Sequence, residues 1–173
     1  MYGGVRSREN IEWRLSNILH TNGRAVLIIR NPFPALVSSW RHVIGDDTID
    51  PDHEDHYEHF QKSALSEVQV WRDIAVDWLL VGREVMVVHY EDMVRDTRKQ
   101  LERVLDFLNF NASEDRLKCV ESFSFSKYKR RRRGIRREWF GQQLFRAVEE
   151  VVGEVNIILK ESGKGIVDEV EFK

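Results

Sequence analysis

Arg30 and Ser38 are the first pair of side chains that could bind an anion. Arg30 directly follows the apolar run Ala25–Ile29, and Ser38 lies eight residues after Arg30. A guanidinium can hold a phosphate through two parallel hydrogen bonds, and a hydroxyl two turns into the next helix could reach the same group. A second interpretation stays open on spacing alone, in which Arg30 pairs with a local carboxylate and Ser38 is an ordinary surface serine.

A dense basic run is the second candidate. Residues 127–137 carry eight Lys or Arg side chains within eleven residues. Such a concentration of positive charge attracts anions, and Gly134 permits a close backbone approach to a ligand. Arg132 and Arg133 stand directly before that glycine. The same run would also fit a solvated charge cluster or a nuclear-localisation-like patch. Trp139, just after the run, could pack its end or stack on a planar base.

A third polar group follows the apolar run Val85–Val88. The segment His89–Asp92 stands where that run ends, and polar residues at a strand exit are candidates for a site. Glu91 and Asp92 could equally cap the helix that follows. Both interpretations remain open from the sequence.

Three histidines, His53, His56 and His59, follow one another at intervals of three residues. They lack a partner motif such as His-Glu-x-x-His, and their segment has the acidic, turn-rich composition of a loop. We therefore predict a solvated acidic surface there and no metal site.

Two buried strands and several long helices must position these residues. Continuous apolar runs predict strands at 25–29 and 84–90, and the 3.6-residue period predicts helices at 9–19, 32–43, 57–80, 94–108, 114–121 and 140–159. Strands separated by long helices indicate a parallel sheet in an α/β fold, with ligands beyond the carboxyl ends of the strands. The tail beyond Gly163 is expected to be loose.

Composition narrows the class of protein further. The 173 residues fit a single domain, and a net charge of −2 disfavours a nucleic-acid binder that uses the arginine run. A single cysteine, Cys119, excludes an internal disulfide framework. No apolar run approaches the roughly 20 residues that a membrane span needs, and the first residues lack the apolar core of a signal peptide.

Two strands leave most edges of a parallel sheet unprotected, so we expect a central strand to be missing.

Together the motifs resemble those of sulfotransferases that use 3′-phosphoadenosine-5′-phosphosulfate. Val26–Pro32 with Ser38 is similar to the family's 3′-phosphate-binding motif, and Val87–Met93 is similar to its strand and Tyr-Glu-Asp segment. Arg132–Trp139 resembles the late Arg-Lys-Gly loop, with arginines replacing a lysine and a glycine and Glu138 replacing an aspartate. The branch called WSC domain-containing sulfotransferases is the most similar, over roughly residues 20–160.

The resemblance implies a partial P-loop-like parallel sheet flanked by helices, without its first, central strand. It implies that Arg30, Ser38, Arg132, Arg133 and Gly134 hold the 3′-phosphate of the nucleotide co-substrate. The family's phosphate loop, Pro-Lys-x-Gly-Thr/Ser, and its Lys-Thr-His segment are not found in this sequence, so the catalytic base stays unknown. We therefore expect residues 1–173 to be a single, N-terminally truncated sulfotransferase-like domain.

The family reaction transfers a sulfuryl group to a hydroxyl or amine, here on a glycan or a protein acceptor. Resemblance places such proteins in the Golgi membrane with a lumenal domain, with the anchor present only in a full-length form. The sequon Asn111-Ala112-Ser113 fits a glycoprotein of that compartment. An alternative is a catalytically inactive remnant that acts as an anion-binding or scaffold module.

Overall fold

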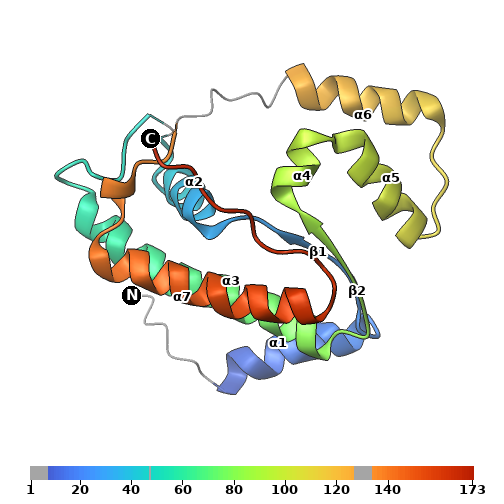
Figure 1. Ribbon diagram of the computed structural model, residues 1–173, viewed down its shortest axis with the longest axis horizontal. Coiled ribbons are helices and arrows are strands. Elements are labelled where there is room, and N and C mark those ends of the chain that lie inside the picture. Colours follow the sequence, from blue (N-terminus) through green and yellow to red (C-terminus); the bar gives the residue numbers. More distant parts are fainter. Residues whose placement is uncertain (1–7, 47, 127–133) are drawn as a thin grey trace.

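The fold is an α/β arrangement of helices around a small parallel sheet (Figure 1). The computed structural model describes residues 8–46, 48–126 and 134–173. Its elements are α1 (Arg8–His20), β1 (Arg24–Ile29), α2 (Pro32–Ile44), α3 (Tyr57–Val81), β2 (Glu84–His89), α4 (Tyr90–Arg95), α5 (Thr97–Phe107), α6 (Glu114–Ser126), the short 3-10 helix η1 (Arg137–Trp139) and α7 (Gln142–Glu161). Among the helices of these residues, none is long and apolar enough to cross a membrane.

β1 and β2 pair in parallel, from Arg24 opposite Glu84 to Ile29 opposite His89. This confirms both predicted strands and the α/β class. Within the described residues the sheet has two strands. Leu27 and Ile29 of β1, with Val85 and Val87 of β2, point to one face because side chains alternate along a strand.

α2 begins where the sequence predicts, because Asn31 and Pro32 together supply a helix start. The Asn31 side chain accepts a hydrogen bond from the Phe33 backbone N–H, and Pro32 occupies the first helical position. The helix ends at Gly45, whose φ of 72° lies in the left-handed region that glycine adopts without strain.

Two clusters of buried side chains form the core, and both are built on α3 and α7, which lie side by side (Figure 1). The first cluster joins α2 to these helices through residues such as Trp40, Phe60 and Val148. The second packs the inner face of the sheet against Ala75, Leu79, Val155 and Leu159. Trp71 and Val152 lie against both clusters.

Of the described side chains, none from α4 to α6 belongs to either cluster. The sequence predicts that Val94, Leu101, Val104, Leu105 and Leu108 point inward, but Leu101, Val104 and Leu105 are half-buried and Val94 and Leu108 are exposed. Their side of the sheet is only partly covered. Val88 on β2 is fully buried there, whereas its register partner Ile28 on β1 is 58% exposed. Two strands offer these helices too little surface to bury a full apolar face.

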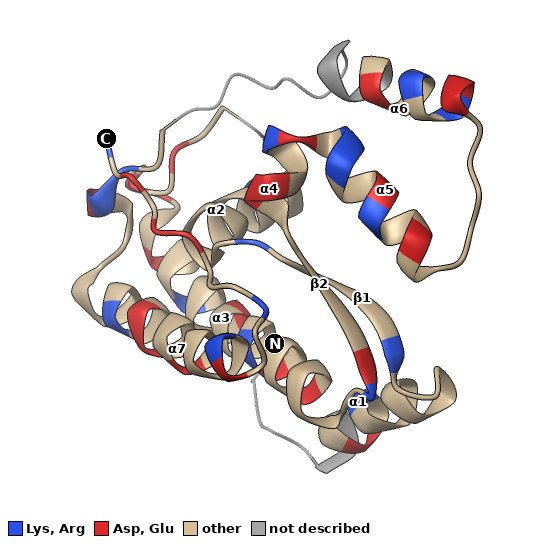
Figure 2. Cartoon of the chain, turned by 45° about the vertical axis from the view of Figure 1, so that its right-hand side comes forward, with Lys and Arg blue, Asp and Glu red and all other residues tan. Residues whose placement is uncertain are grey.

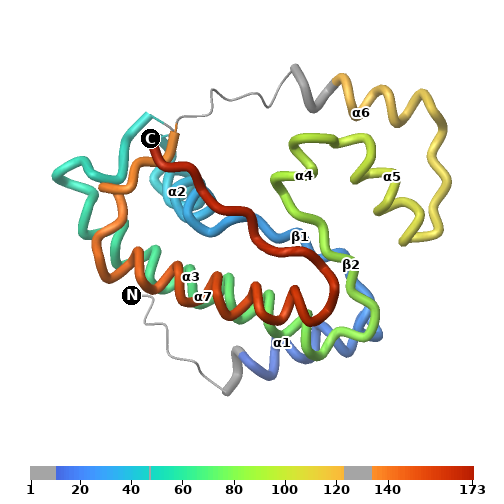
Figure 3. The backbone as a smooth tube through the Cα atoms, in the orientation of Figure 1, coloured from blue at the N-terminus to red at the C-terminus, as the bar shows by residue number. Residues whose placement is uncertain are grey.

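The expectation of a loose tail is wrong. After α7 the chain turns back and runs past the strand ends toward α2, as the red tube in Figure 3 shows. Val167 in this segment is 3% exposed and belongs to the second core cluster. We call residues 163–173 the C-terminal strap.

Candidate functional site

Arg30 lies at the carboxyl end of β1 and carries a guanidinium without an ionic partner among the described residues. Its Cζ stands 4.5 Å from the centroid of the Tyr90 ring, in cation–π contact. Its Nε is buried and makes no hydrogen bond to any residue that the structure describes. The structure thus shows none of the carboxylate pairing that the second interpretation of Arg30 requires.

The parallel register explains why Arg30 and Tyr90 meet. Ile29 is opposite His89, so the next residue of each strand leaves the sheet at the same edge. The Trp71 indole N–H donates to the Arg30 carbonyl oxygen at 3.1 Å. This bond from α3 fixes the backbone from which the guanidinium extends.

Asn31, which is 4% exposed, connects three separate segments next to Arg30. Besides capping α2, its backbone N–H donates to Glu91 Oε1 at 3.1 Å. Its side-chain amide donates to the carbonyl oxygen of Asp168 in the C-terminal strap at 2.7 Å. Glu91 therefore joins the exits of the two strands, and α4 has no side-chain cap hydrogen bond.

The structure shows no direct contact between Arg30 and the other predicted site residues that it describes, Ser38 and Gly134. Ser38 is exposed on α2, and no hydrogen bond joins it to Arg30. Arg132 and Arg133 lie outside the described residues. Gly134 is described, and a β-carbon there would collide with the aliphatic side chain of Lys173. The close approach that this glycine allows within the described chain is therefore to the C-terminal strap.

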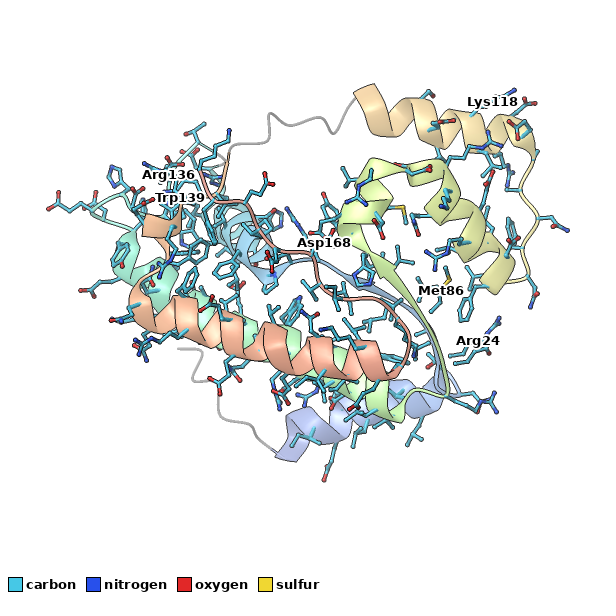
Figure 4. The ribbon with its side chains drawn as sticks, in the orientation of Figure 1. Arg24, Met86, Lys118, Arg136, Trp139 and Asp168 are labelled. Atoms are coloured by element: carbon cyan, nitrogen blue, oxygen red, sulfur yellow. The ribbon has the colours of Figure 1, made fainter. Side chains whose placement is uncertain are left out.

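Arg136, one of the eight cations in the basic run, takes part in a structural cluster that sequence reasoning missed. Its Nη2 bonds Asp50 at 3.1 Å and Asp52 at 3.0 Å, and its guanidinium stacks on Trp139. Arg41 also bonds Asp50, at 2.7 Å, and lies over the same ring. Trp139 is 2% exposed, so it packs the end of the run and is not available to stack on a base (Figure 4). The acidic loop and the arginine are each visible in the sequence, but nothing in either segment indicates the other.

No group of three or more potential metal ligands gathers within the described part of the chain. Of the three histidines, His59 accepts a hydrogen bond from the Trp40 indole N–H at 3.3 Å. His56 makes an edge-to-face contact with the same ring. These two side chains therefore belong to the packing around α2 and α3.

Comparison of the sequence with known protein families identifies the family to which the chain belongs. The family described as "Sulfotransferase domain" matches residues 11–139, which is most of the chain, and the chain belongs to this family. This match shows that the chain is a sulfotransferase-like α/β protein, which confirms the family that the resemblance predicted.

The similar proteins are members of the WSCD family. One from Aedes aegypti is 23% identical over 139 residues, covering 77% of this chain and 44% of the relative. One from Drosophila melanogaster is 24% identical over 116 residues, covering 64% and 36%. The chain therefore spans less than half the length of these curated relatives. No solved structure matches.

Proposed function

We propose that this chain is the C-terminal part of a sulfotransferase domain that binds 3′-phosphoadenosine-5′-phosphosulfate. The complete domain transfers the sulfuryl group from this nucleotide to a hydroxyl or amine of a glycan or protein acceptor. The observation that carries the proposal is Arg30, whose guanidinium has no ionic partner among the described residues and lies at the carboxyl edge of a parallel sheet in a member of the sulfotransferase family.

The chemistry of Arg30 suits a phosphate. Its Nε–H and one terminal N–H form an edge that matches two phosphate oxygens. Within the described part of the chain, the buried Nε lacks the partner that buried polar atoms normally have. The Tyr90 ring holds the guanidinium from one face. Ligands of open parallel sheets bind beyond the carboxyl ends of the strands, where Arg30 lies. An incoming 3′-phosphate would supply the missing acceptor.

The further contacts are proposed from the resemblance. Ser38, Arg132, Arg133 and Gly134 would complete the grip on the 3′-phosphate. The neighbour of Gly134 supports this in one respect, because Ile135 bridges Phe172 of the C-terminal strap, and the strap also binds Asn31.

Sulfuryl transfer also needs an oriented nucleophile, a base, and positive charge near the bridging oxygen. In the family a phosphate loop supplies that charge, and its motif is not found in this sequence. We propose that a preceding segment of a longer protein carries that loop, with its strand pairing to the sheet. The exposed Ile28 and the partial coverage of the relatives support this. A membrane anchor and a Golgi location would belong to that longer protein.

The alternative function is a catalytically inactive module that binds anions or acts as a scaffold. The absence of the phosphate-loop motif from the sequence favours it. Incubating the chain with a labelled sulfate donor and candidate acceptors separates the two, since sulfate transfer by the chain itself excludes the inactive module.

Calorimetric titration with adenosine 3′,5′-bisphosphate tests the proposed donor site. Loss of a charge-assisted hydrogen-bond partner costs about 1.5–3 kcal/mol, so Arg30→Ala should weaken binding roughly ten- to a hundredfold. Arg30→Lys should recover only part of the loss, because an ammonium keeps the charge but not the two-pronged geometry. Arg83→Ala is the matched control, because Arg83 is exposed at the opposite, amino end of β2. Equal affinity in wild type and Arg30→Ala would reject the assignment.

A further inference from the structure

The C-terminal strap lies outside the family match, which ends at residue 139, yet it reaches the candidate site. It begins with two glycines in the left-handed region, Gly163 with φ 65° and Gly165 with φ 83°. Between them, the Lys164 carbonyl oxygen is 2.9 Å from His89 Nε2, at the end of β2. The turn therefore sends the chain back across the carboxyl ends of the strands.

The middle of the strap is fixed on both sides. The Val167 N–H donates to Asn156 Oδ1 of α7 at 2.7 Å, and the Val167 side chain is buried in the second core cluster. One residue later, the Asp168 carbonyl oxygen accepts the hydrogen bond from Asn31. Figure 4 labels Asp168 in the strap near the strand exits. The strap is thus bound to the residue that follows Arg30.

The end of the strap joins the segment that follows the basic run. Phe172 packs edge to face on Phe33 and Phe140, with ring centroids 5.2 Å and 6.3 Å away. It forms a parallel bridge with Ile135, and the Lys173 N–H donates to the Ile135 carbonyl oxygen at 3.0 Å. Gly134 lies against the Lys173 side chain.

We propose that the C-terminal strap is a positioning element of the nucleotide site, and that Phe172 is its positioning residue. The strap connects Gly134 and Ile135 to the strand exit that carries Arg30. It thereby holds these two proposed anion-binding segments, which are distant in sequence, at a fixed distance from each other. This inference rests on the proposed donor site.

The way the strap is attached favours permanent positioning over a lid that opens. A lid must detach at low cost, whereas this segment has a buried valine, a phenylalanine among other aromatic rings, and backbone hydrogen bonds at both ends.

Its acidic residues Asp168, Glu169 and Glu171 are exposed, and the red stretch of the strap in Figure 2 shows this charge. Asp168 lies 3.6 Å from Arg95, and no ion pair joins it to Arg30.

Nucleotide titration of Phe172→Ala in the full chain tests the proposal, with two readouts. The first is affinity for adenosine 3′,5′-bisphosphate, which should fall at least tenfold. Phe172→Leu, which keeps an apolar anchor, should restore most of it. Val148→Ala is the control for general loss of stability, because Val148 is buried in the same core cluster but does not belong to the strap. This control should bind like wild type.

The second readout is the response of two NMR signals to the nucleotide, the Gly134 amide and the Arg30 Nε–H. In wild type both should shift, and in Phe172→Ala only the Arg30 signal should shift. A wild type in which Arg30 responds but Gly134 does not would overturn the positioning role and leave the donor site standing. Unchanged or tighter binding by Phe172→Ala would overturn it as well. If neither wild-type signal responds, the donor site and the positioning role both fail.

Discussion

Arg30 differs from Arg41, Arg95 and Arg136 in what lies beside its guanidinium. Arg41, Arg95 and Arg136 each bond a nearby aspartate, which neutralises their charge locally. Arg30 has an aromatic ring on one face and no carboxylate partner in the part of the chain that the structure describes. Of these four arginines, Arg30 is therefore the one whose charge no described carboxylate offsets, so it is left to meet an anionic ligand.

Replacing Asn31 with alanine should lower the free energy of unfolding by about 1–3 kcal/mol in urea denaturation. The variant loses a helix cap, typically worth about 1 kcal/mol, and it leaves the Asp168 carbonyl oxygen without its donor. Asn156→Ala provides the comparison, because it removes a single hydrogen bond to the strap. A loss for Asn31→Ala no larger than that for Asn156→Ala would contradict the connecting role of Asn31.

For single residues, the sequence predicts contacts with near neighbours in the chain but not with partners distant in sequence. Asn31-Pro32 is a helix start by residue type alone, and the structure confirms it. The bond from Asn31 to Asp168 joins residues 137 positions apart, and nothing in either segment indicates the other. The same holds for Arg136, whose partners Asp50 and Asp52 stand far upstream in an acidic loop.

Among the elements, β1 presents neighbouring isoleucines with opposite environments. Ile29→Ala should cost about 2–5 kcal/mol of stability, because the side chain is buried in the second core cluster. Ile28→Ala should cost at most about 1 kcal/mol, because its side chain on the outer face is mostly in solvent. Thermal or urea unfolding of the two variants measures the difference. Equal losses would show that the outer face of β1 is covered in solution.

α5 and α6 are joined by an ion pair whose pH dependence can be predicted. Both terminal nitrogens of Arg98 bond the Glu114 carboxylate, at 2.8 Å and 2.7 Å, and these hydrogen bonds lower the pKa of Glu114. A lowered folded-state pKa means that the stabilisation is present at neutral pH. It is lost as pH falls below the ordinary range of a glutamate, toward the lowered pKa.

Hydrogen exchange of the α6 amides across pH 3–7, corrected for intrinsic rates, measures this loss. Protection should fall at the acidic end, whereas Glu114→Gln should show the lower protection throughout. A wild-type profile that does not change with pH in this range would contradict the link between the two helices.

Periodicity predicts where helices lie but not how deeply they are buried. The pattern of α3 and α7 gives most of their core residues correctly, because each helix packs against the other and against the sheet. Ile74 of α3, which the period also turns inward, is exposed. The equally regular pattern of α5 is only partly buried, since the sheet face that it meets has two strands. Burial depends on the partner surface, which a helix's own sequence does not contain.

The whole molecule brings its candidate site together through contacts distant in sequence. β1, β2 and the C-terminal strap meet at the strand exits, and Trp71 links that edge to both core clusters. Fold class, strand pairing and family were predictable, because buried strand runs and ordered motifs are local signals. The strap was not, because a glycine-containing, acidic tail has the composition of a loose segment and its order comes from Val167 and Phe172.

The preference of the chain for a 3′-phosphate tests the central claim most directly. Calorimetry would compare adenosine 3′,5′-bisphosphate with adenosine 5′-monophosphate, which lacks only that phosphate, in wild type and in Arg30→Ala. We predict that wild type binds the bisphosphate at least roughly tenfold more tightly and that Arg30→Ala removes most of this difference. Equal affinity of the wild-type chain for the two nucleotides would contradict the account.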